Sequence, residues 1–349
     1  MKVSKLPKAN VNKFLESLQD FGEVIIPKEK QEQPGVYMFD TMTDPSEVAW
    51  EYLRTIIPPK KYLTKPKEVI FKFDSQRGFE EVIEDAEQKR VLFGLHPCDI
   101  HGIKILDVVF THQYTDPYYT RRRNNTVIIG LSCIPDEKCF CKSMHTDYTE
   151  DGFDLALSDI GDGYLVAIGT SLGDDLVAER ADLFTEVEET DRRKYLDFRK
   201  KRNQSFKLDL DIDDLPYILD LEQHSPIWDE LGKRCLTCGS CSMVCPTCYC
   251  FNVYDELNLD ARSGRRIKQW DACLFKDYAL VAGGHNFRED RAERVKNRYY
   301  HKQFRMVEQY GKPSCVGCGR CINACPAGID VVEVLTKVRE GSYAETESS

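Results

Sequence analysis

The sequence lacks the long apolar run that a membrane-spanning helix needs, because no stretch approaches about 20 apolar residues. It also lacks a basic surplus. The formal net charge is -10, which argues against a surface that binds nucleic acid. Residues 1–7 carry charge without an apolar core behind them, so we expect no secretory signal. These absences predict a cytoplasmic protein, and a length of 349 residues suggests at least two domains.

Motifs for several common cofactors are also missing. No Gly-x-Gly-x-x-Gly follows a predicted strand, and neither the glycines at 161–163 nor those at 169–173 fit the nicotinamide or flavin fingerprint. The sequence contains no phosphate-binding P-loop and no His-Glu-x-x-His zinc motif. We therefore expect any hydride chemistry to reside on a partner protein.

Cysteine, by contrast, is abundant, with 15 residues in the chain. In a reducing compartment these thiols are not expected to form structural disulfides. Metal ligation is the remaining common use of many clustered cysteines.

The strongest pattern is a cysteine run that occurs twice with every spacing intact. Each run reads Cys-x2-Cys-x2-Cys-x3-Cys-Pro, the spacing of bacterial ferredoxins that hold two [4Fe–4S] clusters. Three cysteines of a run wrap one cube, and the fourth ligates the other cube. The predicted ligands are Cys235, Cys238, Cys241 and Cys325 for the first cluster, and Cys315, Cys318, Cys321 and Cys245 for the second.

Structural zinc is an alternative for these runs, but it usually uses two simple Cys-x2-Cys pairs. Gly239 and Gly319 lie inside the loops, where the backbone needs freedom to approach a cube. Pro246 and Pro326 redirect the chain after each fourth cysteine. Two [4Fe–4S] clusters are therefore the favoured interpretation.

A second set of cysteines follows two predicted strands. Cys98 comes just after the strand 90–95, and Cys133 just after the strand 126–131, with Cys139 and Cys141 close behind. If the strands are parallel neighbours, these thiols meet at the carboxyl edge of the sheet, where α/β folds bind ligands. A third [4Fe–4S] cluster is the preferred interpretation. A zinc site and small buried thiols are the alternatives.

The remaining cysteines lie within or near the insertion 247–314 between the two runs. Cys248, Cys250 and Cys273, with His285 as the nearest other candidate by sequence, form a candidate for an extra metal site, which is the less favoured interpretation. The alternative is structural thiols that pack beside a cluster and tune its potential. The basic stretch 288–305 reads as a solvated helix face, or as a docking surface for an acidic partner.

The fold class predicted is an N-terminal α/β domain over residues 1–224, followed by a mainly helical, dicluster ferredoxin-like domain over residues 225–349. The apolar runs 90–95 and 126–131 suit buried parallel strands. Helices are expected over 10–18, 99–110 and 191–206 from their apolar spacing, caps or charge. Another is expected over 45–57, because Asp44, Pro45 and Glu47 form a capping-box pattern.

Several segments of this sequence resemble the beta subunits of soluble archaeal [NiFe] sulfhydrogenases and the related A subunit of anaerobic sulfite reductase. The resemblance covers nearly the whole chain. Pro97 departs from it, since a small residue such as alanine is expected there. The segments that carry the resemblance are Arg54–Lys61, His96–Ile100, Cys133 with Cys139–Cys141, Pro226–Asp229, Cys245–Cys250, Trp270–Cys273, Ala282–Arg288 and Cys315–Cys321.

The resemblance implies an electron-relay subunit in a cytoplasmic multi-subunit oxidoreductase. Its partners would be a flavin-containing subunit that handles NAD(P)H and a catalytic core, a [NiFe] hydrogenase pair or a sulfite reductase; heterodisulfide-reductase-type assemblies use similar modules. It also supports the third cluster. A rival function is reduction of sulfur, polysulfide or a disulfide at an open iron held by Cys248, Cys250 and Cys273, and a free electron carrier is a third.

Overall fold

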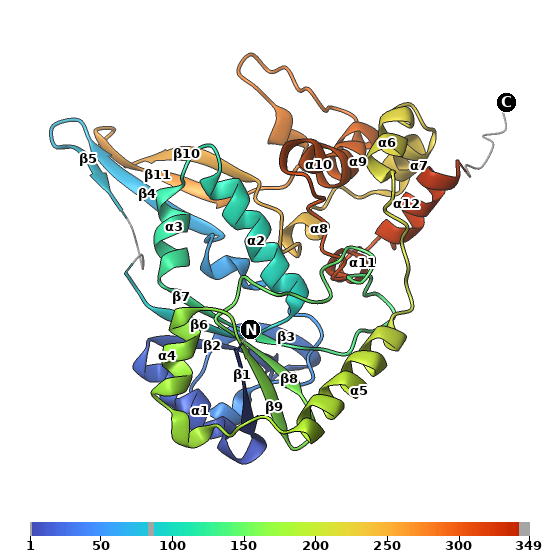
Figure 1. The fold of residues 1–349 in the computed structure, drawn as a ribbon. Coiled ribbons are helices and arrows are strands. Elements are labelled where there is room, and N and C mark those ends of the chain that lie inside the picture. The colour runs from blue at the N-terminus through green and yellow to red at the C-terminus, as the bar shows by residue number, and fades with distance from the viewer. Residues whose placement is uncertain (1, 83–86, 342–349) are drawn as a thin grey trace.

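The computed structural model describes residues 2–82 and 87–341, and Figure 1 shows their arrangement. Strands and helices are mixed along the chain, which confirms the α/β character. The strands are β1 (Lys2–Pro7), β2 (Glu23–Lys30), β3 (Gln33–Thr41), β4 (Lys67–Asp74), β5 (Gly78–Glu81), β6 (Arg90–Leu95), β7 (Thr126–Leu131), β8 (Leu155–Asp159), β9 (Gly163–Ile168), β10 (Phe251–Leu257) and β11 (Ser263–Trp270).

Helices cover the larger sheet and make up much of the C-terminal part. They are α1 (Val11–Ser17), α2 (Pro97–Thr111), α3 (Pro117–Asn124), α4 (Ser171–Ala178), α5 (Glu189–Ser205), α6 (Leu215–Leu221), α7 (Ile227–Arg234), α8 (Ser240–Met243), α9 (Arg291–Tyr300), α10 (Met306–Tyr310), α11 (Arg320–Asn323) and α12 (Val331–Glu340). Within the described residues, none of them is both long and apolar enough to cross a membrane.

A seven-stranded sheet in the order β1-β9-β8-β7-β6-β2-β3 forms the centre of the N-terminal part. Its middle strands β2, β6, β7 and β8 run parallel, and the pairs at its edges are antiparallel. Every residue of β6 and β7 is buried, as their unbroken apolar sequences predicted. The carboxyl ends of β6 and β7 therefore reach the same edge of the sheet.

Alternate residues of these buried strands serve two separate cores. Val91 and Phe93 face a core shared with α1 and α4, whereas Leu92 faces a core shared with α2 and α3. This alternation follows from the twofold side-chain period of a strand. Helices thus cover both faces of the sheet, and the edge beyond β6 and β7 remains available for other groups.

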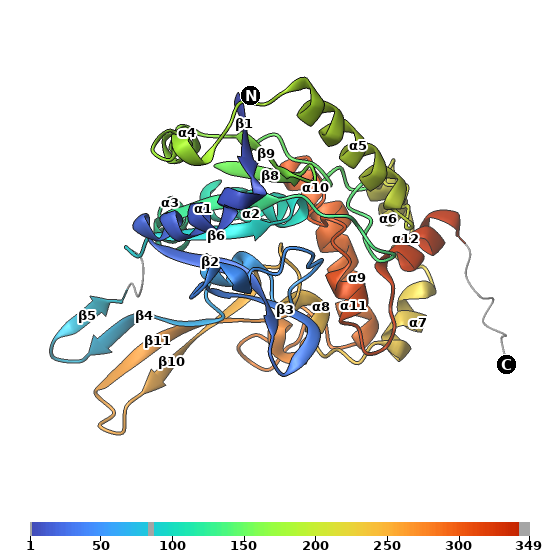
Figure 2. The same ribbon diagram turned by 90° about the horizontal axis from the view of Figure 1, so that it is seen from below.

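The second sheet combines distant parts of the sequence. Its order is β10-β11-β4-β5, and all three pairings are antiparallel. Figure 2 shows these strands extending away from the rest of the molecule. The expected mainly helical character of the C-terminal part is not confirmed, because residues 251–270 form a β-hairpin that joins β4.

The prediction of a helix over residues 45–57 is wrong. Asp44 and Glu47 do form the capping box, but the helical geometry ends after the single 3₁₀ turn Pro45–Glu47. Val48 is extended, with a ψ angle of 118°, and the amide of Ala49 donates to the carbonyl of Pro27 at 2.8 Å. Contact with β2 therefore overrides the local helix signal.

Candidate metal centres

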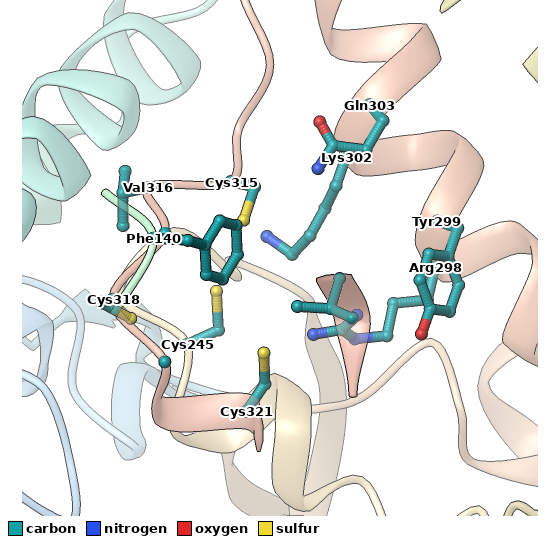
Figure 3. Close-up of a pocket in the computed structure, with 13 residues that line it drawn as sticks. Phe140, Cys245, Arg298, Tyr299, Lys302, Gln303, Cys315, Val316, Cys318 and Cys321 are labelled. Atoms are coloured by element: carbon teal, nitrogen blue, oxygen red, sulfur yellow. The ribbon is translucent and has the colours of Figure 1, made fainter. Parts of the chain in front are cut away.

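Four predicted ligands surround one cavity. Cys315, Cys318 and Cys321 come from the second cysteine run, and Cys245 comes from the first run. Figure 3 shows these side chains around the cavity together with Phe140, Arg298 and Lys302. The structure therefore brings together the set in which the two runs exchange their fourth cysteine.

A second cavity holds the complementary set. It is lined by Cys235, Cys238, Cys241 and Cys325. Cys321 and Arg298 line this cavity as well as the first, so the two cavities are neighbours. Cys238 is exposed, whereas the other cysteines are buried or half-buried. The second cavity therefore lies nearer the protein surface than the first.

The loops that carry these cysteines have the backbone that the sequence suggested. Gly239 and Gly319 adopt φ angles of 74° and 72°, and each begins a short helix, α8 or α11. A Cβ on Gly239 would lie 2.5 Å from the Phe275 ring, and one on Gly319 would lie 2.5 Å from the Lys138 carbonyl oxygen. Both positions therefore need glycine for conformation and for space.

Backbone amides also point at the sulfur atoms. The amide of Thr237 donates to Cys235 Sγ at 3.4 Å, and that of Ile329 donates to Cys325 Sγ at 3.3 Å. Hydrogen bonds to the ligand sulfur atoms are among the features that set the potential of an iron–sulfur cluster. The loops thus present thiols with amide donors already in place.

Burial favours the protonated form of two thiols at the first cavity. It raises the pKa of Cys315 to about 11 and that of Cys321 to about 12. Ligation to metal requires the thiolate and releases the proton. Among the described side chains, no three His, Cys, Asp or Glu residues lie close enough to hold a single ion. In an iron–sulfur cube each cysteine binds a different iron atom, whereas all the ligands of a zinc site bind one ion. Four cysteines spread around a cavity therefore fit a cube better than a zinc ion.

The cysteines predicted for a third cluster also gather in one region. Cys98 lies in the first turn of α2, where Pro97 occupies the first helical position without distortion, because that position needs no amide donor. Cys98 shares a buried cluster with Cys141 and Val316, and Cys318 packs against it. Burial raises the pKa of Cys141 well above its ordinary value, and the negative charges of Cys133 and Cys139 raise it further.

The loop that carries Cys139 and Cys141 is fastened to the loop of the second cysteine run. The amide of Phe140 donates to the carbonyl of Gly317 at 2.9 Å, and the Thr146 hydroxyl donates to the carbonyl of Val316 at 2.7 Å. Arg54 donates to Cys139 Sγ and to the carbonyl of Cys318, both at 3.1 Å, and also pairs with Asp136. The third set of thiols thus adjoins the first cavity.

The extra metal site is not assembled as one group. A hydrogen bond with Cys273 lowers the pKa of Cys250 to about 6, whereas Cys248 forms its sulfur contact with Cys245. His285 is exposed and packs edge-on against Phe287, with ring centroids 4.7 Å apart. The structure therefore brings Cys250 and Cys273 together and places Cys248 beside the first cavity.

Buried cations near the cysteines were missed by the sequence interpretation. Lys60 donates to the Cys248 carbonyl at 2.7 Å, and Lys302 donates to the Thr247 hydroxyl at 2.8 Å. Arg320 forms a bidentate ion pair with Asp99 at 2.7 and 2.9 Å, and both side chains are buried. Arg298 is buried too, so the stretch 288–305 is not simply a solvated face. The available signal was helical spacing, because Arg298 lies three residues and Tyr299 four residues after the apolar Val295.

Comparisons with known proteins find a matching family, a relative and a similar solved structure. Residues 234–329 match the family described as a 4Fe-4S dicluster domain. The beta subunit of sulfhydrogenase 2 from Pyrococcus furiosus is 43% identical over 342 residues, which cover 98% of this chain and 99% of the relative. A chain of the xenon-derivatised F420-reducing [NiFe] hydrogenase complex from Methanosarcina barkeri shares 12% identity at a TM-score of 0.35, over 58% of this chain and 89% of that chain.

Proposed function

Because this chain belongs to the family of sulfhydrogenase beta subunits, we propose that it is the iron–sulfur electron-relay subunit of a cytoplasmic oxidoreductase complex. A bound [4Fe–4S] cube supplies one-electron transfer at a potential set by charge, hydrogen bonds and exposure. The observation that carries the proposal is a pair of adjacent cavities. Each cavity is lined by three cysteines of one run and the fourth cysteine of the other run.

The residues assigned to the two cubes are those that line the cavities. One cube is assigned to Cys235, Cys238, Cys241 and Cys325, and the other to Cys315, Cys318, Cys321 and Cys245. A third cube is proposed on Cys98, Cys133, Cys139 and Cys141 because Cys98 and Cys141 pack beside Cys318. The set around Cys315–Cys321 adjoins both of the others. We therefore propose that the three sets act as a row, in which the set nearest the surface includes the exposed Cys238.

A row of one-electron sites suits a position between two catalytic partners. We propose that a flavin- and NAD(P)H-binding subunit docks at one end of the row. The catalytic subunits, most simply the large and small subunits of a [NiFe] hydrogenase, dock at the other end. The name of the 43% identical relative, sulfhydrogenase, supports the hydrogenase branch over the sulfite reductase branch. All residues assigned to the three cubes belong to this chain.

The exchange of fourth ligands is tested by Cys325→Ser in full-length protein purified without oxygen. We expect the EPR signal of the cube on Cys235, Cys238 and Cys241 to change or disappear, while the other signal persists. Cys245→Ser is the matched control and should damage the opposite cube. Loss of the Cys315–Cys321 cube in Cys325→Ser would contradict the assignment.

Iron and acid-labile sulfide counts on the unmodified chain test the number of cubes. Two cubes predict about 8 irons, three predict about 12, and a fourth centre raises the total to about 16. Turnover of polysulfide by the isolated chain with reduced viologen would favour the rival reductase function. An isolated chain that is inactive until it is recombined with its partners supports the relay.

A further inference from the structure

One helix brings two cations against the cysteines. Helix α9 continues into the π-helical turn His301–Arg305 and then into α10, which together form one helical rod over residues 291–310. This rod belongs to the insertion between the two cysteine runs. π turns inside α-helices are rare and recur at functional sites. Arg298 and Lys302, four residues apart, both point toward the first cavity in Figure 3.

Arg298 has contact with both cavities, whereas Lys302 lines only the first. The Arg298 side chain is deeply buried, with the residue only 6% exposed. Within the described part of the chain, its Nε atom is buried without a hydrogen-bond partner. A buried donor without a partner costs free energy, so a group that accepts from it is expected in one of the cavities.

The charge environment of Arg298 points to the same acceptor. Arg298 lines the second cavity together with Cys241, and it lines both cavities together with Cys321. Cys241 is assigned to one cube and Cys321 to the other. A permanently charged guanidinium thus lies between two sets of thiolates, with a free donor.

We propose that Arg298 is a positioning residue shared by the two cubes of the dicluster domain, where its charge makes both easier to reduce. This inference rests on the proposed two-cluster function. A reduced cube carries one more negative charge than an oxidised one, and a nearby cation in a low-dielectric interior favours the more negative state. Because Arg298 lines both cavities, it raises the two potentials together.

The test compares Arg298→Gln with Arg298→Lys in the full-length chain purified without oxygen, with both potentials measured by EPR-monitored redox titration. We expect the glutamine variant to make reduction of each cube about tenfold less favourable, which corresponds to about 59 mV for one electron. The lysine variant retains a charge and is expected to keep both potentials closer to the parent values.

Two further substitutions on the same rod make the result specific. Lys302→Met should lower only the potential of the cube on Cys245 and Cys315, because Lys302 lines only that cavity. Arg294→Gln should move neither potential, because this buried arginine lies one turn earlier and lines neither cavity. Its Nε, like that of Arg298, has no hydrogen-bond partner among the described residues, and its Nη1 atom donates to the carbonyl of Arg288 at 3.0 Å. Arg294 therefore controls for the loss of a buried arginine from α9.

Unchanged potentials in an Arg298→Gln variant that holds both cubes would overturn the proposal, as would a shift of one potential alone. If the glutamine variant does not bind its cubes, the potentials measured for the lysine variant decide whether the proposal holds. Potentials near the parent values support the charge, and a lysine variant that loses its cubes or shows lowered potentials contradicts it. A parent chain without cubes would instead refute the proposed function, so the two failures are distinguishable.

Discussion

At the scale of single residues, the ion pair between Asp99 and Arg320 joins two regions that carry candidate ligands. Asp99 follows Cys98 directly, and Arg320 precedes Cys321. Their side chains are 0% and 3% exposed, and Arg320 Nε also donates to the Thr55 carbonyl at 3.3 Å. One buried contact thus fixes the third set of cysteines relative to the second run.

Asp99→Asn should therefore destabilise the chain strongly. Removing one partner of a buried pair leaves an uncompensated charge and typically costs about 3–5 kcal/mol. The measurement is urea unfolding without oxygen, followed by circular dichroism. Glu333→Gln is the control, since Glu333 pairs with Lys337 on an exposed helix face and such pairs contribute only about 0.3–0.5 kcal/mol. Equal losses from the two variants would show that the Asp99 pair contributes no more than a surface pair.

The same residues show how far sequence reasoning reaches at this scale. The cysteines were predicted because their spacing is itself the signal. Asp99 and Arg320 lie 221 positions apart, and no local pattern connects them. Arg298 looked like one charge in a mixed basic and acidic stretch, and only the packing of α9 shows that it is buried. Long-range partners of this kind depend on tertiary structure.

At the scale of elements, the contact between two loops depends on one glycine. Gly317 has a φ angle of +60°, and a Cβ there would lie 2.5 Å from the Phe140 carbonyl carbon and the Cys141 nitrogen. The Gly317 carbonyl also accepts the hydrogen bond from the Phe140 amide. Close backbone approach, rather than flexibility, is the reason for glycine at this position.

Gly317→Ala should separate the loop of Cys139 and Cys141 from the loop of Cys315–Cys321. We expect lower thermal stability, and loss of iron from the third set before the others. Gly328→Ala is a matched control, because its φ angle is +61° and a Cβ there meets nothing within 4 Å. The control should cost only the backbone strain, about 1–2 kcal/mol. Iron retained equally by both alanine variants would show that the loop contact is dispensable.

Elements with strong local patterns were predictable, and those set by distant partners were not. The strands 90–95 and 126–131 and the helix over 99–110 are confirmed within a few residues as β6, β7 and α2. The helix over 45–57 failed because β2 and an ion pair between Lys28 and Glu47 hold that segment. The hairpin of β10 and β11 was missed, because Phe251–Leu257 does not alternate strictly between apolar and polar residues: Val253 and Tyr254 are adjacent, and so are Asp255 and Glu256.

At the scale of the whole molecule, the two parts differ in what their cores contain. The seven-stranded sheet has two cores of aliphatic and aromatic side chains. The C-terminal core instead packs α7, α9 and α12 around Cys235, Cys273 and other cysteines. The division at residue 224 stays a prediction, because this core also includes Phe140, Leu210 and Leu219. No sequence pattern predicted the pairing of β11 with β4, which connects residues about 200 positions apart.

Removal of the cubes should therefore affect the two parts unequally. Metal-binding free energy contributes to folding where the ligands lie inside the core. After oxidation and chelation, we expect amide hydrogen exchange to increase throughout α7, α9 and α12. Amides of β6 and β7 should stay protected, because the cores on both faces of their sheet contain no cysteine. Mass spectrometry of peptic fragments measures both regions in one experiment.

Helix α4 provides the internal control, because it packs on the seven-stranded sheet and shares no core with the cysteines. Its exchange should match that of β7 rather than that of α12. Equal loss of protection in β7 and α12 would mean that the cubes support the fold of both parts. That outcome would contradict the proposed boundary near residue 224, since α/β and dicluster regions with separate cores should lose protection separately.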